Sequence, residues 1–196
     1  MAISLLGNLF TRKDSSVNEK DKSNEKGEKQ MSNTDNQCTK KAADLVKDYL
    51  TRNDWHFSSN DTDGQSIIDG GIGGIGGTVV NSVKFRLIID KDDMQNYVVC
   101  PVTFDEDKRN SVMEFITRAN YGLKYGEFQM DLRDGELLFH MTLPTCLASD
   151  DGMCEKLIHI PPSMFKKYIK GIERVAYFGV TDIKGEVDKC ERENNS

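Results

Sequence analysis

Histidine and cysteine are the residues of this chain most able to support catalysis or bind a metal, and their spacing favours neither role. The five cysteines form no C-x-x-C pair, and Cys146, Cys154 and His159 lack the spacing of a zinc site. We therefore expect free thiols, as in the reducing cytoplasm, and histidines that are solvated or hydrogen-bonded. The other residues of these two types are His56, His140, Cys38, Cys100 and Cys190.

The glycine-rich segment Gly70–Gly77 contains a G-x-G-x-x-G pattern, which in dinucleotide-binding proteins closes a turn between a strand and a helix. Here β-branched and alternating apolar residues follow over 78–89, so a strand is expected and not a helix. The segment therefore favours a flexible loop or an irregular strand edge. A loop that binds a small molecule or a nucleotide through Gly70–Gly77 stays open as an alternative.

Carboxylates are abundant, but no spacing assigns them a reaction. Asp105, Glu106 and Asp107 stand at the expected start of a helix, where negative charge interacts favourably with the helix dipole. The chain contains no G-x-S-x-G, H-E-x-x-H or P-loop motif. We predict no catalytic residue, no metal ligand and no cofactor, and we expect a protein that is not an enzyme. An enzyme of unrecognised type is the remaining alternative.

Helical and strand periodicities predict the elements that must position these residues. Apolar residues recur at helical spacing over 42–50, 112–119 and 164–176, and they alternate over 83–89 and 128–143. A hairpin is expected over Glu127–Leu143, with a two-residue type I′ turn at Asp134-Gly135. Together these patterns predict an α+β domain, a twisted antiparallel β-sheet with amphipathic helices packed on one face.

The face of the sheet opposite the helices is the predicted partner-binding surface. The alternative for this face is a simple solvated surface. Ile88 and Leu138 interrupt its polar pattern, and exposed apolar strand residues are typical of contact surfaces. The predicted partner-binding residues are Lys84, Arg86, Ile88, Gln129, Asp131, Arg133, Leu138 and His140.

Composition limits the class of protein. The chain has 196 residues, of which 37% are hydrophobic and 30% charged, with a formal charge of −6. The acidic balance argues against binding of nucleic acid, and no apolar run is long enough to span a membrane.

The distribution of polar residues predicts three parts. We expect a disordered polar arm over 1–38, an α+β domain over 39–183 and a disordered tail over 184–196. Within the arm, residues 1–10 carry a short amphipathic pattern, which fits either a frayed terminus or weak contact with a membrane surface or a protein groove.

Two stretches of the chain are distinctive, YGLKYGEFQMDLRDGELLFHMTLP and IPPSMFKKYIKGIERVAYFG. Both resemble the YbjN-domain family, described as regulators of bacterial sensory transduction. The resemblance covers roughly Lys40–Asp182 and is clearest over Ser111–Gly179. It implies a fold similar to type III secretion chaperones, a bacterial cytoplasmic setting, and binding to other proteins or to a second copy as a dimer. It implies no enzymatic activity and no cofactor.

The residues and the resemblance agree on the architecture, and the resemblance implies the function. We expect a non-enzymatic protein-interaction module, chaperone-like or regulatory, that binds a polypeptide partner or itself. The identity of that partner is not encoded in any motif of the chain.

Overall fold

A computed structural model describes residues 25–62 and 64–193, with side chains described from Asp35 onward. The chain divides into two units, 1–32 and 33–196, and the second contains the whole sheet. The predicted amphipathic segment 1–10, and the predicted disordered arm up to residue 24, lie outside the described residues.

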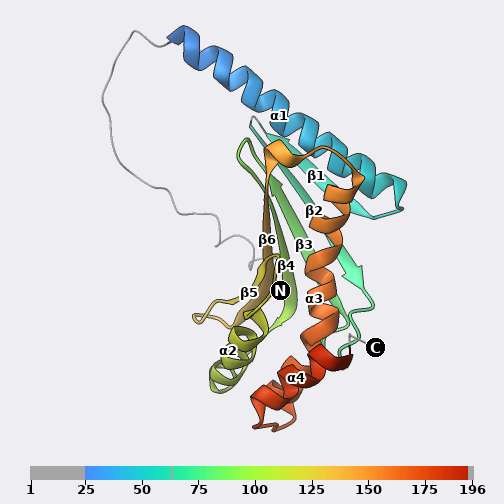
Figure 1. Ribbon diagram of the computed structural model, residues 1–196, viewed down its shortest axis with the longest axis vertical. Coiled ribbons are helices and arrows are strands. Elements are labelled where there is room, and N and C mark those ends of the chain that lie inside the picture. The colour runs from blue at the N-terminus through green and yellow to red at the C-terminus, as the bar shows by residue number, and fades with distance from the viewer. Residues whose placement is uncertain (1–24, 63, 194–196) are drawn as a thin grey trace. The chain divides into compact units, whose positions relative to one another are not determined.

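The described strands form one antiparallel sheet in the order β1-β2-β3-β4-β6-β5 (Figure 1). The strands are β1 (Phe57–Thr62), β2 (Gln65–Gly73), β3 (Ser82–Ile89), β4 (Asp93–Thr103), β5 (Glu127–Met130) and β6 (Glu136–Pro144). The helices are α1 (Glu25–Arg52), α2 (Glu106–Asn120), α3 (Asp151–Tyr177) and α4 (Ile183–Glu193), with a 3-10 turn at Thr145–Leu147. This arrangement confirms the predicted α+β fold.

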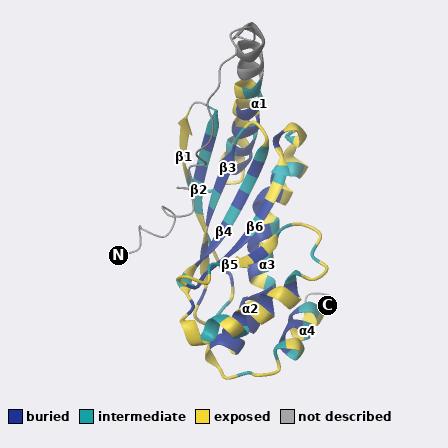
Figure 2. Ribbon diagram, turned by 90° about the vertical axis from the view of Figure 1, so that its left-hand side faces the viewer, coloured by how far each residue is buried: buried dark blue, intermediate teal, exposed yellow. Residues whose placement is uncertain are grey.

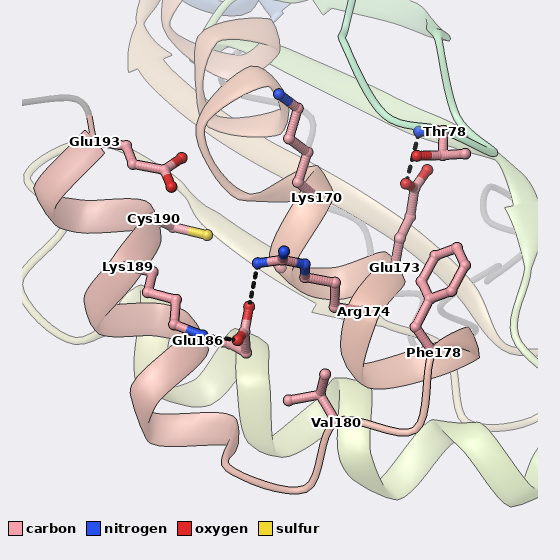
Figure 3. A pocket seen from close by; sticks show the side chains of 11 residues that line it. Thr78, Lys170, Glu173, Arg174, Phe178, Val180, Glu186, Lys189, Cys190 and Glu193 are labelled. Atoms are coloured by element: carbon pink, nitrogen blue, oxygen red, sulfur yellow. Dashed lines mark hydrogen bonds and ion pairs between the residues drawn. The ribbon is translucent and has the colours of Figure 1, made fainter.

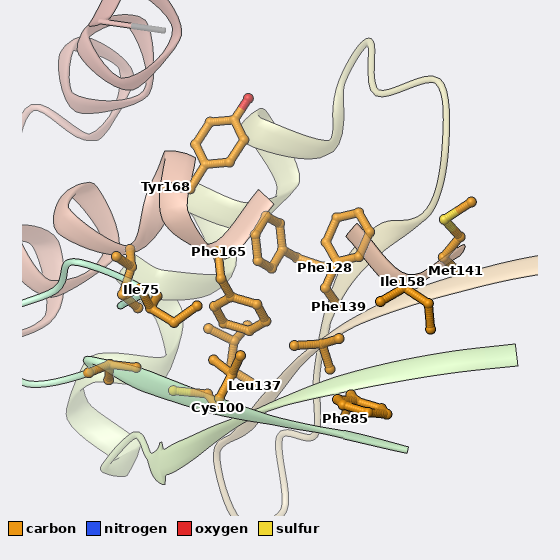
Figure 4. Close-up of a cluster of buried hydrophobic side chains, with 14 of the residues drawn as sticks. Ile75, Phe85, Cys100, Phe128, Leu137, Phe139, Met141, Ile158, Phe165 and Tyr168 are labelled. Carbon is orange, nitrogen blue, oxygen red and sulfur yellow. The ribbon is translucent and has the colours of Figure 1, made fainter. Parts of the chain in front are cut away.

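The core lies between one face of the sheet and the helices. Helix α3 packs on β4 and β6, and α1 reaches α3 through Tyr49 and His159, whose side chains are 3.1 Å apart. Aromatic rings fill the centre of this layer, where Phe128 lies edge-to-face on Phe139 and Phe165 (Figure 4). The alternating residues predicted to face the core, Val83, Phe85, Leu87 and Ile89, are all buried.

Helix α3 begins at Asp151 and continues through Pro161 and Pro162, whereas the helical spacing in the sequence covered only residues 164–176. Proline has no backbone N–H, so the Leu157 carbonyl, four residues before Pro161, lacks its usual helical donor. The buried Asn96 side chain on β4 donates to this carbonyl at 2.7 Å. A side chain of the sheet thus replaces the hydrogen bond that the helix cannot make.

Both predicted disordered ends are wrong in part. Helix α1 begins at Glu25, well inside the predicted arm, because the Lys, Glu and Gln residues there are good helix formers and a packed helix extends cooperatively. Residues 183–193 form α4, although a disordered tail was predicted from residue 184. Its buried residues Glu186, Val187 and Cys190 recur at helical spacing, too few to stand out in a polar sequence.

The predicted two-residue turn at Asp134-Gly135 is also wrong. Strand β5 ends at Met130 and β6 begins at Glu136, so a five-residue loop joins them. Gly135 has a φ of +79°, and a Cβ atom there would lie 2.0 Å from the Phe104 carbonyl oxygen. Its carbonyl accepts a hydrogen bond from the Phe104 N–H at 2.9 Å. The glycine is therefore needed for close contact with the end of β4.

Strand β4 is irregular around Pro101. Strand β4 lies between β3 and β6, and its pairing with β6 shifts register between Val99 and Thr103. Because proline cannot donate to a ladder, a bulge at this point keeps Pro101 inside a central strand. Among the described residues, no helix combines the length and apolar character needed to cross a membrane.

Candidate functional site

The predicted partner-binding residues lie mostly on one face of the sheet. The strand register aligns Arg86 of β3 with Tyr97 of β4, and Tyr97 with His140 of β6. It likewise aligns Lys84 with Val99, and Val99 with Leu138. This face is opposite the face that α3 covers, and we call it the uncovered face (Figure 2).

Two of the predicted residues lie beyond the strands. Asp131 and Arg133 belong to the loop that joins β5 and β6, at one end of the uncovered face. The Arg133 guanidinium donates to both Asp131 carboxylate oxygens, and Arg133 is 80% exposed. These hydrogen bonds hold the pKa of Asp131 down to about 2. The loop therefore presents a fixed ion pair and not a free carboxylate.

Ile88 and Leu138 do not protrude as exposed apolar residues, and that prediction is wrong. Ile88 is 6% exposed and Leu138 is 5% exposed. Ile88 stands between Ile67 and Gln95 on the neighbouring strands, and Leu138 stands beside Val99, so adjacent side chains cover them. The uncovered face therefore has two small recessed apolar patches, one at Ile88 and one at Leu138, which a row of polar side chains separates.

A stacked pair of rings forms the centre of the uncovered face. The rings of Tyr97 and His140 are 4.4 Å apart and nearly parallel, at 11°. The Tyr97 hydroxyl donates to Gln95, and His140 Nε2 lies 3.1 Å from the Thr142 hydroxyl. Burial lowers the pKa of His140, with Glu127 acting in the opposite direction, so the imidazole is neutral at pH 7. It is held as a packed ring, half-buried on the predicted face.

A bidentate ion pair fixes a second part of this face. Arg86 Nε donates to Asp69 at 2.7 Å, and Arg86 Nη2 donates to the other Asp69 oxygen at 3.0 Å. Such paired contacts give the guanidinium one preferred geometry. Lys84 and Gln129, on the same face of the sheet, are exposed to solvent.

Glu136 is a buried carboxylate at the loop end of the uncovered face. It is 6% exposed, and its Oε2 atom has no hydrogen-bond partner in the described part of the chain. Burial, together with Asp134 and Asp131, raises its pKa. No sequence pattern had pointed to Glu136, or to Asp69, Gln95 and Tyr97. Gln95 and Tyr97 are two residues apart, and this period-two spacing was the signal that could have placed them on the same face of the sheet.

The glycine-rich segment is partly strand, since β2 extends to Gly73, and the rest is a loop that binds a carboxylate of its own chain. The Glu173 side chain on α3 accepts hydrogen bonds from three consecutive backbone amides at 2.7–2.8 Å, those of Thr78, Val79 and Val80. Figure 3 shows the contact with Thr78. A Cβ atom at Gly77 would lie 2.5 Å from Glu173 Oε1, so glycine permits this approach. These three amides are thus already occupied by a carboxylate of the same chain and cannot hold a phosphate.

A cavity of about 650 Å³ lies beside this loop, between α3 and α4 (Figure 3). Its charged groups largely neutralise one another, because Glu186 pairs with both Arg174 and Lys189. It lies away from the predicted partner-binding residues. We assign it no ligand.

The other predicted chemical groups are dispersed. All five cysteines are free, and burial raises the pKa values of Cys100 and Cys154 to about 11, which makes these thiols poor nucleophiles. His159 contacts Tyr49 and Trp55, away from His140. The described residues contain no group of three or more His, Cys, Asp or Glu side chains placed to hold a metal ion.

Comparison with known proteins gives one match. The sequence profile of the YbjN family, described as "Putative bacterial sensory transduction regulator", matches residues 42–174. No curated protein and no solved structure matches the chain. The matched region begins within α1, contains the whole sheet and ends in the last turn of α3.

Proposed function

The chain belongs to the YbjN family, and on this premise we propose that it is a regulatory protein without enzymatic activity that binds a polypeptide partner on the uncovered face. The observation that carries the proposal is the form of this face. Two small recessed apolar patches, at Ile88 and at Leu138, flank a row of polar side chains that are already held in place. The family description supports the regulatory part of the proposal.

Preorganisation favours binding at this face. Each flexible side chain that an interface immobilises costs about 0.5–1.5 kcal/mol of binding free energy. Here Asp69 holds Arg86, and the stacking contact holds Tyr97 and His140 before any partner arrives. Tyrosine and arginine are also enriched at the centres of protein interfaces. Free thiols at all five cysteines support a cytoplasmic location.

The test changes the charge at two exposed residues of the uncovered face. The double variant Lys84→Glu/Gln129→Arg changes two exposed side chains and leaves the core untouched. A charge-matched control is Lys166→Glu/Gln37→Arg, at exposed positions of α3 and α1. Polypeptides captured from the producing cell are quantified by mass spectrometry with wild type and both variants.

We expect wild type and control to enrich the same polypeptides, and the face variant to enrich them about tenfold less. Equal enrichment by all three proteins contradicts the proposal. Sedimentation of each protein alone shows whether the captured polypeptide is a second copy.

A further inference from the structure

We propose that the outer edge of β1 binds an extended segment of the partner polypeptide as an added strand, and that Lys40 selects a carboxylate within that segment. This inference rests on the proposed function, because it assumes a polypeptide partner. It concerns a different surface from the uncovered face. The two edges of the sheet differ in how far they are closed.

The β5 edge is closed. Strand β5 has only four residues, and the Asn120 side chain at the end of α2 binds its outer backbone. Asn120 Nδ2 donates to the Phe128 carbonyl at 2.9 Å, and the Phe128 N–H donates to Asn120 Oδ1 at 2.8 Å. Helix α2 also packs against this strand. No further strand can pair here without displacing Asn120.

The β1 edge is open. Strand β1 pairs with β2 over six residues without a bulge, and five of the six are exposed (Figure 2). It contains no proline or lysine, the residues that commonly protect edge strands. Within the described part of the chain, its backbone makes no hydrogen bond outside the sheet. Such an edge offers a row of free amides and carbonyls to an extended peptide.

The one charged side chain of β1 does not repel a peptide carboxylate strongly. Asp61 accepts hydrogen bonds from Lys47 at 2.7 Å and from Ser66 at 2.6 Å. These contacts lower the pKa of Asp61, and Lys40 contributes in the same direction. Asp61 is thus a neutralised carboxylate with a second ammonium close by.

Lys40 gives the edge its selectivity. It lines a cavity of about 350 Å³ between α1 and the β1–β2 hairpin, which Asp61 and Thr62 also line. In the described part of the chain Lys40 makes no hydrogen bond or ion pair. A strand added to β1 would lie about 4.8 Å from β1. We infer that the Lys40 side chain reaches a strand in that position. An acidic residue of the added segment fits that position.

A second copy of β1 fits less well than a different polypeptide. The acidic side chain that it would bring is Asp61, which its own Lys47 already holds at 2.7 Å. The free Lys40 ammonium would then stay unpaired. The occupant we infer is therefore a polar, extended segment with an available Glu or Asp.

The backbone direction at Ser59 provides a clean test. Thr62 and Gln65 flank a two-residue turn and so direct their backbone groups toward each other. Backbone groups alternate along a strand, so the N–H of Ser59 points away from β2. Ser59→Pro removes this outer donor, and Ser59→Ala keeps it as the matched control. Ser59→Lys is a second edge-blocking variant that retains the backbone donor.

The probes are eight-residue peptides of alternating Thr and Ser with Glu, Gln or Lys at one central position. The full chain is titrated with each peptide, and amide signals of β1 are followed by NMR. We expect the Glu peptide to shift the Ser59 and Asp61 amides of wild type and Ser59→Ala, with binding weakened about tenfold or more by Ser59→Pro. Ser59→Lys weakens it as well. Lys40→Ala removes the preference for Glu over Gln and Lys.

Three results overturn the inference. They are unshifted β1 amides with every peptide, equal binding by the Pro and Ala variants of Ser59, and equal binding of the Glu and Lys peptides. A concentration-dependent shift of β1 amides without peptide also overturns it, in favour of a second copy. If peptide binding fails while the Lys84→Glu/Gln129→Arg variant still loses its captured partner, the edge inference fails and the proposed function stands.

Discussion

His140 is a single residue whose surroundings make a prediction about pH. Its ring lies against Tyr97 at 4.4 Å on the uncovered face, and burial lowers its pKa below the usual 6.5, with Glu127 opposing. The unfolded chain therefore binds a proton more readily than the folded chain. The contribution of His140 to the free energy of unfolding is complete above pH 6.5 and falls as the pH drops through 6.5. It levels off below the lowered pKa of the folded state. Urea unfolding at pH 7.5, 6.5 and 5.5 measures this loss.

The comparison that isolates His140 uses two histidine variants. We expect His140→Gln to lose less stability than wild type between pH 7.5 and 5.5, because it has no imidazole to protonate. The exposed His56→Gln variant is the control and is expected to follow wild type. An unchanged pH dependence in His140→Gln contradicts the assignment of a buried neutral ring.

At the scale of elements, Glu173 joins α3 to the loop after β2. Its carboxylate accepts from three backbone amides, although it stands 93–95 residues away from them in the chain. Glu173→Gln keeps one acceptor oxygen but places an NH₂ group at the other position, which leaves at least one of the three amides without a partner. We expect a loss of about 1–3 kcal/mol in the free energy of unfolding. Urea unfolding compares it with the control Glu193→Gln, an exposed residue of the same cavity.

The two outcomes are easily separated. A loss in Glu173→Gln that is no larger than the loss in Glu193→Gln shows that the three hydrogen bonds do not anchor the loop. A selective loss, with faster hydrogen exchange of the Val80 amide, supports the anchor.

Local patterns predicted the elements better than the contacts between them. Period-two alternation placed Val83, Phe85 and Leu87 on the buried face, because alternation is a property of one strand. The depth of Ile88 depends on Ile67 and Gln95 of neighbouring strands, and strand register is not visible in one segment. Two further contacts escaped prediction for the same reason. They are the Glu173 anchor and the Asn96 hydrogen bond to α3, which join residues distant in sequence.

For the domain as a whole, α4 is a helix outside the region that the family profile matches, which ends at residue 174. It packs on α2 and α3, with Val187 and Cys190 buried and Glu186 paired with Arg174 at 3.2 Å. Gly171 of α3 leaves the space that Cys190 occupies. These contacts connect α4 to the core and not only to its own sequence neighbours. Helix α4 should therefore unfold together with the sheet.

Truncation after Asp182 tests whether α4 belongs to this cooperative unit. Burial of an aliphatic side chain contributes about 1.5–3 kcal/mol, so loss of Val187, Cys190 and the ion pair should lower stability by about 2–4 kcal/mol. We expect the truncated chain to keep its sheet, to unfold at lower urea in one transition, and to resemble Val187→Ala in direction. Lys184→Ala, an exposed change on α4, is the control. Unchanged stability after truncation, or a separate early transition in the full chain, would mean that α4 is a peripheral addition to the family fold.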